Sequence, residues 1–183
     1  MSALAIAGHD RFTLTEFPDC ERTALDVQAA WHDPFFKRAF SVWDSKRGTA
    51  DAPFRRDIDA FDFPSDILPR LVLIEVLRGP LRFRFRLTGT KADQIHECNI
   101  TGLYSDDLKP AMLAQSIRRD FTEIVETGHP QWVELLFTNC RGHRRRTRVL
   151  RLPLLANDSS SEDPRIGFIM SVFSFQKTAE IGA

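Results

Sequence analysis

The pattern of hydrophobic and polar positions is most informative between Leu71 and Leu87. The segment Leu71–Leu77 (LVLIEVL) is almost entirely apolar, which is typical of a strand covered on both faces. After a turn at Arg78-Gly79-Pro80, apolar and basic side chains alternate, with Phe83, Phe85 and Leu87 on one face and Arg82, Arg84 and Arg86 on the other. A period of two with one basic face predicts a strand that has one wet side. Together the two segments predict a hairpin in a half-buried sheet.

Two longer segments repeat apolar residues at helical spacing. The first follows Asp33, a good N-cap, and Pro34, and it stops before Gly48. Its apolar stripe consists of Phe36, Ala39, Phe40 and Trp43 and needs a partner surface. The second helix, Ala111–Thr127, starts after Pro110 and is stopped by Gly128.

The remaining elements are shorter or less regular. We predict strands at about Gln131–Asn139, Arg144–Leu155 and Arg165–Phe175, and a short helix from Thr90 to about Glu97. Residues 1–20 lack periodicity and are expected to form a loose arm, followed by a short helix from Thr23 to Trp31. A hairpin, a helical excursion and three further strands predict an α+β domain with one sheet.

Composition limits the class of protein without naming a function. The 183 residues suit one domain with a real core, and 43% are hydrophobic. Twenty-five basic and 25 acidic residues cancel, so net charge gives no argument for nucleic acid or a membrane. Three widely spaced cysteines argue against a disulfide framework or a zinc site and favour a reducing cytoplasm. The chain lacks a signal-peptide pattern and a run of transmembrane length.

Several short motifs, in order, resemble a compact bacterial subfamily of PAS domains. They are Trp43, the run Pro53-Phe54-Arg55-Arg56-Asp57-Ile58-Asp59, the strand end Arg86-Leu87-Thr88-Gly89-Thr90, Thr101-Gly102 with Leu108, and Leu150–Leu154. The resemblance implies a PAS fold, with a five-stranded antiparallel sheet of order 2-1-5-4-3, helices on one face and an N-terminal helical extension. One departure is His96-Glu97-Cys98-Asn99, where the family leads us to expect a glycine.

The same resemblance suggests how the chain is divided. We expect an arm and short helix at 1–30, a single PAS domain with its flanking helix at 31–177, and a tail at 178–183. It implies a non-enzymatic sensory or regulatory module in signal transduction that acts by binding a small ligand or a protein partner. No cofactor is predicted, although an unidentified small molecule in the PAS cavity is compatible with the fold.

Three sets of site residues follow from this reading. A ligand pocket between the long helix and the sheet is predicted to be lined by Phe85, His96, Phe121, Leu135, Phe137, Phe168 and Met170. The stripe of the helix Asp33–Arg47 has two candidate docking surfaces, the sheet of its own chain or that of a second protomer, and we predict a homodimer through Phe36, Phe40 and Trp43. Structural ion pairs are expected among Arg55, Asp57, Asp59 and Arg86.

A few residues suggest other chemistries. The basic run Arg141–Arg151 offers an alternative function, binding of a nucleotide or nucleic acid, but it holds no aromatic residue for base stacking. A solvated hairpin tip paired with nearby carboxylates is the plainer reading. Asn139-Cys140-Arg141 resembles the flavin-adduct motif of LOV photosensors, although there the cysteine sits on a helix and Cys140 is expected in a turn. No acid, base and nucleophile stand in a recognisable arrangement, and no histidine pair has metal-ligand spacing.

Overall fold

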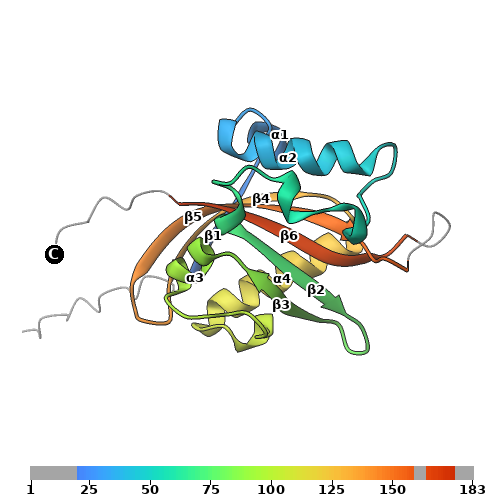
Figure 1. Ribbon diagram of the computed structural model, residues 1–183. Coiled ribbons are helices and arrows are strands. Elements are labelled where there is room, and N and C mark those ends of the chain that lie inside the picture. Colours follow the sequence, from blue (N-terminus) through green and yellow to red (C-terminus); the bar gives the residue numbers. More distant parts are fainter. Residues whose placement is uncertain (1–19, 159–163, 176–183) are drawn as a thin grey trace, which may run out of the picture.

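The architecture is one six-stranded antiparallel sheet with helices on both faces. A computed structural model describes residues 20–158 and 164–175 (Figure 1). The strands are β1 (Cys20–Leu25), β2 (Leu71–Leu77), β3 (Arg82–Thr88), β4 (Gln131–Thr138), β5 (Arg144–Leu155) and β6 (Ile166–Phe175). The α-helices are α1 (Val27–Ala30), α2 (Pro34–Arg47), α3 (Thr90–His96) and α4 (Ala111–Thr127). Short 3-10 helices lie at Arg55–Asp57, Ala60–Asp62, Leu68–Arg70 and Ser105–Asp107.

The strand order confirms the predicted sheet and adds one strand to it. In space the order is β1-β4-β5-β6-β2-β3. Without β1, and counted from β2, this is the expected order 2-1-5-4-3. The predicted loose arm and Thr23–Trp31 helix were therefore partly wrong, since Cys20–Leu25 pairs antiparallel with β4 and only Val27–Ala30 is helical. The residue types of β1 (CERTAL) do not alternate between apolar and polar, so they carried no readable strand signal.

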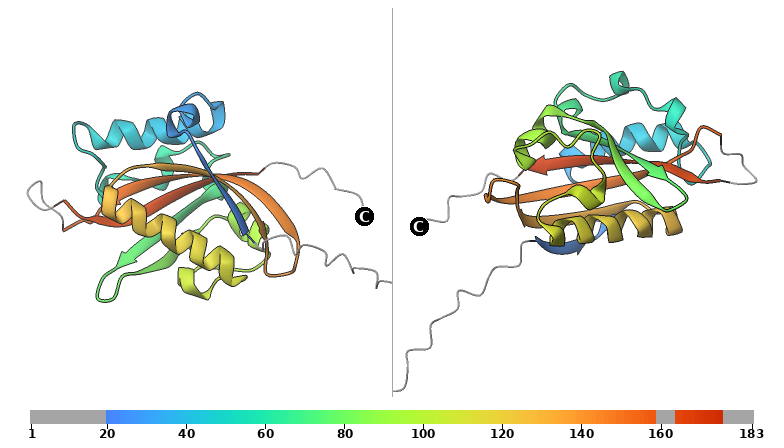
Figure 2. Two further views of the ribbon diagram at one scale, coloured as in Figure 1. Left: turned by 180° about the vertical axis from the view of Figure 1, so that it is seen from behind. Right: turned by 90° about the horizontal axis from the view of Figure 1, so that it is seen from below.

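Helices cover both faces of the sheet, because the predicted N-terminal helical extension packs on the face opposite the other helices. Helix α4 lies along one face, and α1 and α2 lie across the other (Figures 1 and 2). The apolar stripe of α2 accounts for this packing. Phe36 and Trp43 are buried within the chain, and the Trp43 indole Nε1–H donates to the carbonyl oxygen of Pro153 at 2.8 Å.

The buried stripe corrects the expected docking helix. Phe36 packs edge-on against Trp132 of β4, and the half-buried Phe40 stacks on Trp31. Because the chain's own sheet already covers Phe36 and Trp43, these two side chains are not exposed for a second protomer. Homodimer formation stays a prediction, but it loses this helix face as its basis.

The loop before β2 fastens the α2 layer to the end of the sheet, but not by the ion pairs expected. None of Arg55, Asp57, Asp59 and Arg86 forms an ion pair with another of the four. Arg55 donates to the carbonyl oxygen of Ile58, and Asp59 caps the following 3-10 turn through the N–H of Phe61. Aspartates in turns generally bind their own backbone in this way, which satisfies the carboxylate locally.

Backbone contacts make the connection instead. Leu155 N–H donates to the carbonyl oxygen of Pro53 at 2.8 Å, and Arg56 binds both the side chain and the carbonyl of Asn157. The predicted tail at 178–183 and most of the arm lie outside the described residues. Within the described part of the chain, no helix is long and apolar enough to cross a membrane.

Candidate functional site

An internal cavity lies between α4 and the sheet, and it includes five of the seven predicted pocket residues. Phe85, His96, Phe121, Leu135 and Phe137 line it. Further lining comes from β2, β5, β6, α4 and the segment after α3 through Val72, Ile74, Ile100, Leu113, Ile117, Arg151, Ser171 and Phe173. The cavity measures ≈ 20 Å³, which is about enough room for one water molecule.

Phe168 and Met170 were wrongly placed in the pocket. In the β2–β6 register, Val72 pairs with Ser171 and Ile74 with Ile169. Paired residues share a face, so the odd-numbered side chains of β6 point toward the cavity and Met170 points toward α2. The sequence could not decide this, because β6 is apolar on both faces and a shift of one residue leaves its pattern nearly unchanged.

His96 is one of three polar residues that line the cavity, together with Arg151 and Ser171. It is the last residue of α3, it is 6% exposed, and its ring lies 5.4 Å from the ring of Phe137. Burial lowers the pKa of His96 to about 4, because the imidazolium would lose its hydration. At neutral pH the cavity therefore faces an uncharged imidazole.

A buried ion cluster adjoins the cavity and was not predicted. Arg151 on β5 pairs with Asp120 on α4, and Arg22 on β1 approaches the other carboxylate oxygen at 2.7 Å. Arg151 and Asp120 are 2% and 0% exposed, and burial lowers the pKa of Arg151. Its guanidinium also lies 5.3 Å from the ring centre of Phe121.

The sequence held one weak signal for this cluster. Asp120 lies on the same side of α4 as Leu113, Ile117 and Ile124, where an unpaired carboxylate would be costly to bury. Such a position demands a cation, but its identity comes from a strand distant in the sequence. Without the sheet register, Arg151 reads as one more member of the surface run.

Ser171 supplies an unpaired polar atom. Its side-chain oxygen is buried and has no hydrogen-bond partner among the described residues. It belongs to the central strand β6 and lines the cavity together with Arg151 and His96. A buried hydroxyl without a partner costs about 1–3 kcal/mol, so an occupant that bonds to it gains that amount.

The basic run Arg141–Arg151 is largely neutralised by carboxylates. Outside the buried Arg151–Asp120 pair, the ion pairs are Arg144–Glu21, Arg145–Glu97, Arg146–Glu134 and Arg148–Glu134. These contacts support the plainer reading of the run, in which a solvated hairpin is paired with nearby acids. One Glu, residue 134 on the neighbouring strand, serves two of the arginines.

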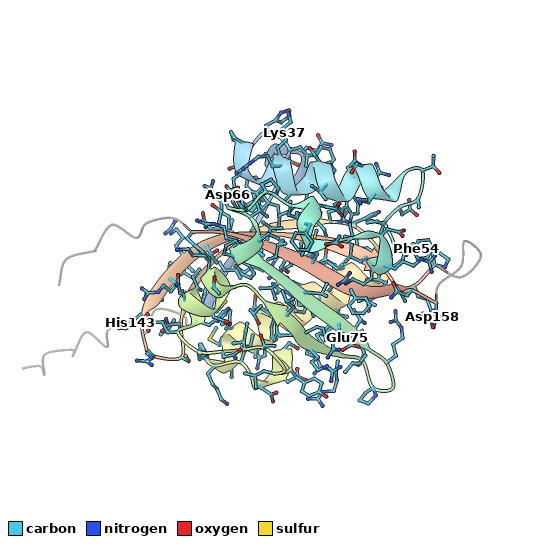
Figure 3. The ribbon with its side chains drawn as sticks, viewed as in Figure 1. Lys37, Phe54, Asp66, Glu75, His143 and Asp158 are labelled. Carbon is cyan, nitrogen blue, oxygen red and sulfur yellow. The ribbon has the colours of Figure 1, made fainter. Side chains whose placement is uncertain are left out.

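The β4–β5 turn is fastened to the end of α3, beside the cavity. Figure 3 shows His143 on this hairpin, at the opposite end of the sheet from Phe54 and Asp158. Glu97 adopts a left-handed backbone conformation (φ 54°), which explains why a glycine was expected in this segment. Its carboxylate pairs with His143 and Arg145, and these partners lower the pKa of Glu97.

Neither a metal nor a bulky cofactor matches this arrangement of residues. Among the described residues, no group of three or more His, Cys, Asp or Glu side chains could hold a metal ion. Sites for drug-sized ligands measure roughly 300–1,000 Å³, far above the ≈ 20 Å³ of this cavity. Cys140 lies in a turn between strands rather than on a helix, as the sequence predicted.

Comparison with known protein families gives one match. A family model described as a PAS domain matches residues 32–170, most of the chain. Among solved structures, one of a variant of the protein RsLOV aligns with a TM-score of 0.43 and 12% identity, covering 61% of this chain and 62% of that one. A fungal LOV domain photoreceptor aligns with a TM-score of 0.40 and 14% identity, covering 59% and 76%. The search of curated proteins found no match.

Proposed function

The chain belongs to the PAS domain family, and we propose that it is a non-enzymatic sensory module whose input is a small molecule bound in the cavity between α4 and the sheet. The observation that carries this proposal is the unpaired Ser171 hydroxyl in a cavity otherwise lined mainly by apolar side chains. Ligand sites combine apolar walls with a few placed polar groups in this way.

The lining defines the class of ligand. Ile117, Leu135 and Phe137 offer apolar contact, and the Ser171 hydroxyl offers one hydrogen bond. That hydroxyl donates to an acceptor such as a carbonyl or carboxylate oxygen, whereas the Arg151 charge at the same wall is already paired with Asp120. The ligand is therefore a small, mostly apolar molecule that carries one hydrogen-bond acceptor.

The size of the cavity sets how such a ligand acts. Only about one water molecule fits between the present side chains. A larger ligand enters when α4 side chains such as Ile117 move away from the sheet. That movement is the source of differential affinity between an empty and a filled state, without which a ligand cannot shift a conformational equilibrium.

A protein partner is the second candidate, and an exposed aromatic residue favours it. The Phe61 side chain is 93% exposed, on the 3-10 turn next to the α2 layer. A large exposed aromatic ring is a common anchor at protein interfaces. In this alternative the core cavity is only packing space, and the signal passes through the α2 face of the molecule.

The experiment combines native mass spectrometry of the freshly purified chain with methyl NMR. The probes are small carboxylic acids, ketones and alcohols, added one at a time. We expect at least one probe to shift the Ile117 and Leu135 methyl resonances, and Ser171→Val to weaken its binding about tenfold or more. Ser174→Val is the matched control, because Ser174 lies on the same strand but on the opposite face and does not line the cavity.

Two outcomes would overturn the ligand proposal. The first is the absence of any bound mass together with unchanged Ile117 and Leu135 resonances for every probe. The second is equal binding to wild type and Ser171→Val. Either result would favour the second candidate, binding of a protein partner at the surface. Phe61→Ser is the first variant with which to test that candidate.

A further inference from the structure

Two of the three cysteines, distant in the sequence, come together at the cavity's edge. Cys98 follows α3, and Cys140 lies in the turn between β4 and β5. The Cys140 Sγ donates to the carbonyl oxygen of His96 at 2.6 Å, which brings its thiol to the residue two positions before Cys98. The Cys140 thiol helps to raise the pKa of Cys98, as a neighbouring thiol does. Cys20, on β1, is the third thiol.

The backbone around this thiol pair is held from both sides. Asn139 donates through Nδ2 to the carbonyl oxygen of Ile95 at 2.9 Å, in a buried position. Its Oδ1 accepts from the N–H groups of Arg141 and His143 at 3.0 Å, which fixes the turn that presents Cys140. These bonds hold the turn against the end of α3 independently of the two sulfur atoms.

Charged groups hold the same two segments together on the outside. Glu97, between His96 and Cys98, binds His143 at 2.9 Å and also Arg145. A non-glycine residue in a left-handed conformation is strained, and it persists only where surrounding contacts favour it. The fold thus keeps the Cys98 backbone close to the Cys140 turn.

We propose that Cys98 and Cys140 are a redox-active pair that a peroxide oxidises to an intramolecular disulfide. In the first step the Cys140 sulfur attacks one peroxide oxygen of hydrogen peroxide, the O–O bond breaks, and Cys140 sulfenic acid and one water form. In the second step the Cys98 sulfur attacks the sulfenic sulfur, the S–O bond breaks, and the S–S bond forms with release of a second water. Overall two thiols are oxidised by two electrons and one peroxide is reduced to two waters.

Exposure decides which sulfur reacts first. Cys140 is exposed at the turn, whereas Cys98 is partly buried. Burial and the Cys140 thiol raise the pKa of Cys98 to about 11, so Cys98 is mostly protonated at neutral pH. The thiolate is the nucleophile toward peroxide, so Cys140 is the attacking residue and Cys98 the resolving one.

The disulfide would link the β4–β5 hairpin covalently to Cys98, two residues after the end of α3. His96, whose carbonyl oxygen accepts from Cys140 in the reduced state, is also a lining residue of the cavity. Oxidation removes that S–H donor and adds a covalent link in its place. The redox chemistry goes beyond the proposed ligand function and does not require any molecule in the cavity.

The test uses the full chain, treated with hydrogen peroxide and then with dithiothreitol. We expect the intact mass to fall by about 2 Da, the mass of two hydrogen atoms, and to be restored by the dithiol. Peptide mapping is expected to identify a Cys98–Cys140 link, and the Tm of the oxidised form to rise by about 4 °C or more. Cys20→Ser is the control and is expected to behave as wild type.

The single variants separate the two roles. Cys98→Ser is expected to accumulate Cys140 sulfenic acid, trapped by dimedone, and Cys140→Ser to give no disulfide. The proposal is overturned if both thiols stay alkylatable after peroxide treatment, if the link includes Cys20, or if it joins two chains. Because peptide mapping is done on the wild type, the result does not depend on the variants folding.

Discussion

At the scale of single residues, the buried ionisable groups set what the core can tolerate. His96 is kept neutral by burial beside Phe137, whereas the equally buried Arg151 is paired with the Asp120 carboxylate. The two groups differ in whether they need a partner of opposite charge. An imidazole can lose its proton, but a guanidinium cannot, so Arg151 needs a carboxylate wherever it is buried.

His96 predicts a loss of stability in mild acid. The folded-state pKa of about 4 lies below the ordinary value of 6.5, so between these values the unfolded chain binds more protons. The free energy of unfolding should therefore be highest with respect to this group above pH 6.5. It should fall as the pH drops, and at pH 5 it should be about 2 kcal/mol lower. Urea unfolding at pH 7.5 and pH 5 measures this change.

The variant His96→Leu isolates the contribution of this imidazole. It should lose about 2 kcal/mol less than wild type between the two pH values. His129→Leu, a substitution at an exposed histidine, should lose as much as wild type. An equal loss in wild type and His96→Leu would show that other groups cause the acid sensitivity.

Removing Arg151 should destabilise the fold strongly. Arg151→Met leaves the buried Asp120 carboxylate with the more exposed Arg22 and Arg119 as its cations, and breaking a buried pair costs about 3–5 kcal/mol. Denaturant unfolding at neutral pH gives the loss. Arg146→Met, at an exposed pair on the same strand, should cost less than about 1 kcal/mol.

The double variant Arg151→Met with Asp120→Leu tests the cause. If the cost comes from an uncompensated charge, removing Asp120 as well should recover a large part of the lost stability. A double variant as unstable as the sum of the two single variants would instead assign the loss to packing.

At the scale of elements, α2 is defined by what it lies against. Its N-cap Asp33 accepts from the N–H groups of Phe35 and Phe36, so the local signals for its start were sufficient. Its stripe had two solutions, the chain's own sheet or another protomer. The structure selects the first, with Phe36 against Trp132 and Trp43 bonded to the end of β5.

The bond from Trp43 predicts a measurable effect. Trp43→Phe keeps most of the apolar contact but leaves the Pro153 carbonyl without this donor, at a cost of about 1–3 kcal/mol in unfolding free energy. Trp31→Phe is the matched control, because the Trp31 indole N–H has no partner among the described residues. Equal losses of unfolding free energy in the two variants would show that the Trp43–Pro153 hydrogen bond does not stabilise the packing of α2.

At the scale of the whole molecule, the sheet is the middle one of three layers, between the α2 layer and α4. The α4 side holds the cavity and the ion cluster, and the α2 side is closed by aromatic packing. The basic hairpin gains no large positive field, because acids from β1, β4 and the residue after α3 lie against it. This balance is why the nucleic-acid alternative gains no support from the fold.

The sequence by itself determined the family, five of the six strands and the long helices. These follow from local signals: a period of two in β3, caps at α2, and apolar spacing along α4. It also placed His96 and Phe121 at the cavity, since the fold type fixes which elements enclose it. Strands, helices and helix caps depend mainly on residues that are close together in the chain, so they can be predicted from the sequence.

Tertiary structure alone decided the rest. Met170 faces away from the cavity because strand register, rather than composition, sets the direction of side chains in a strand that is apolar on both faces. Arg151 meets Asp120, and Cys140 meets Cys98, across long separations in the chain. Pairings of this kind arise only when the sheet has brought distant segments together. They therefore could not be predicted from any local pattern of residues.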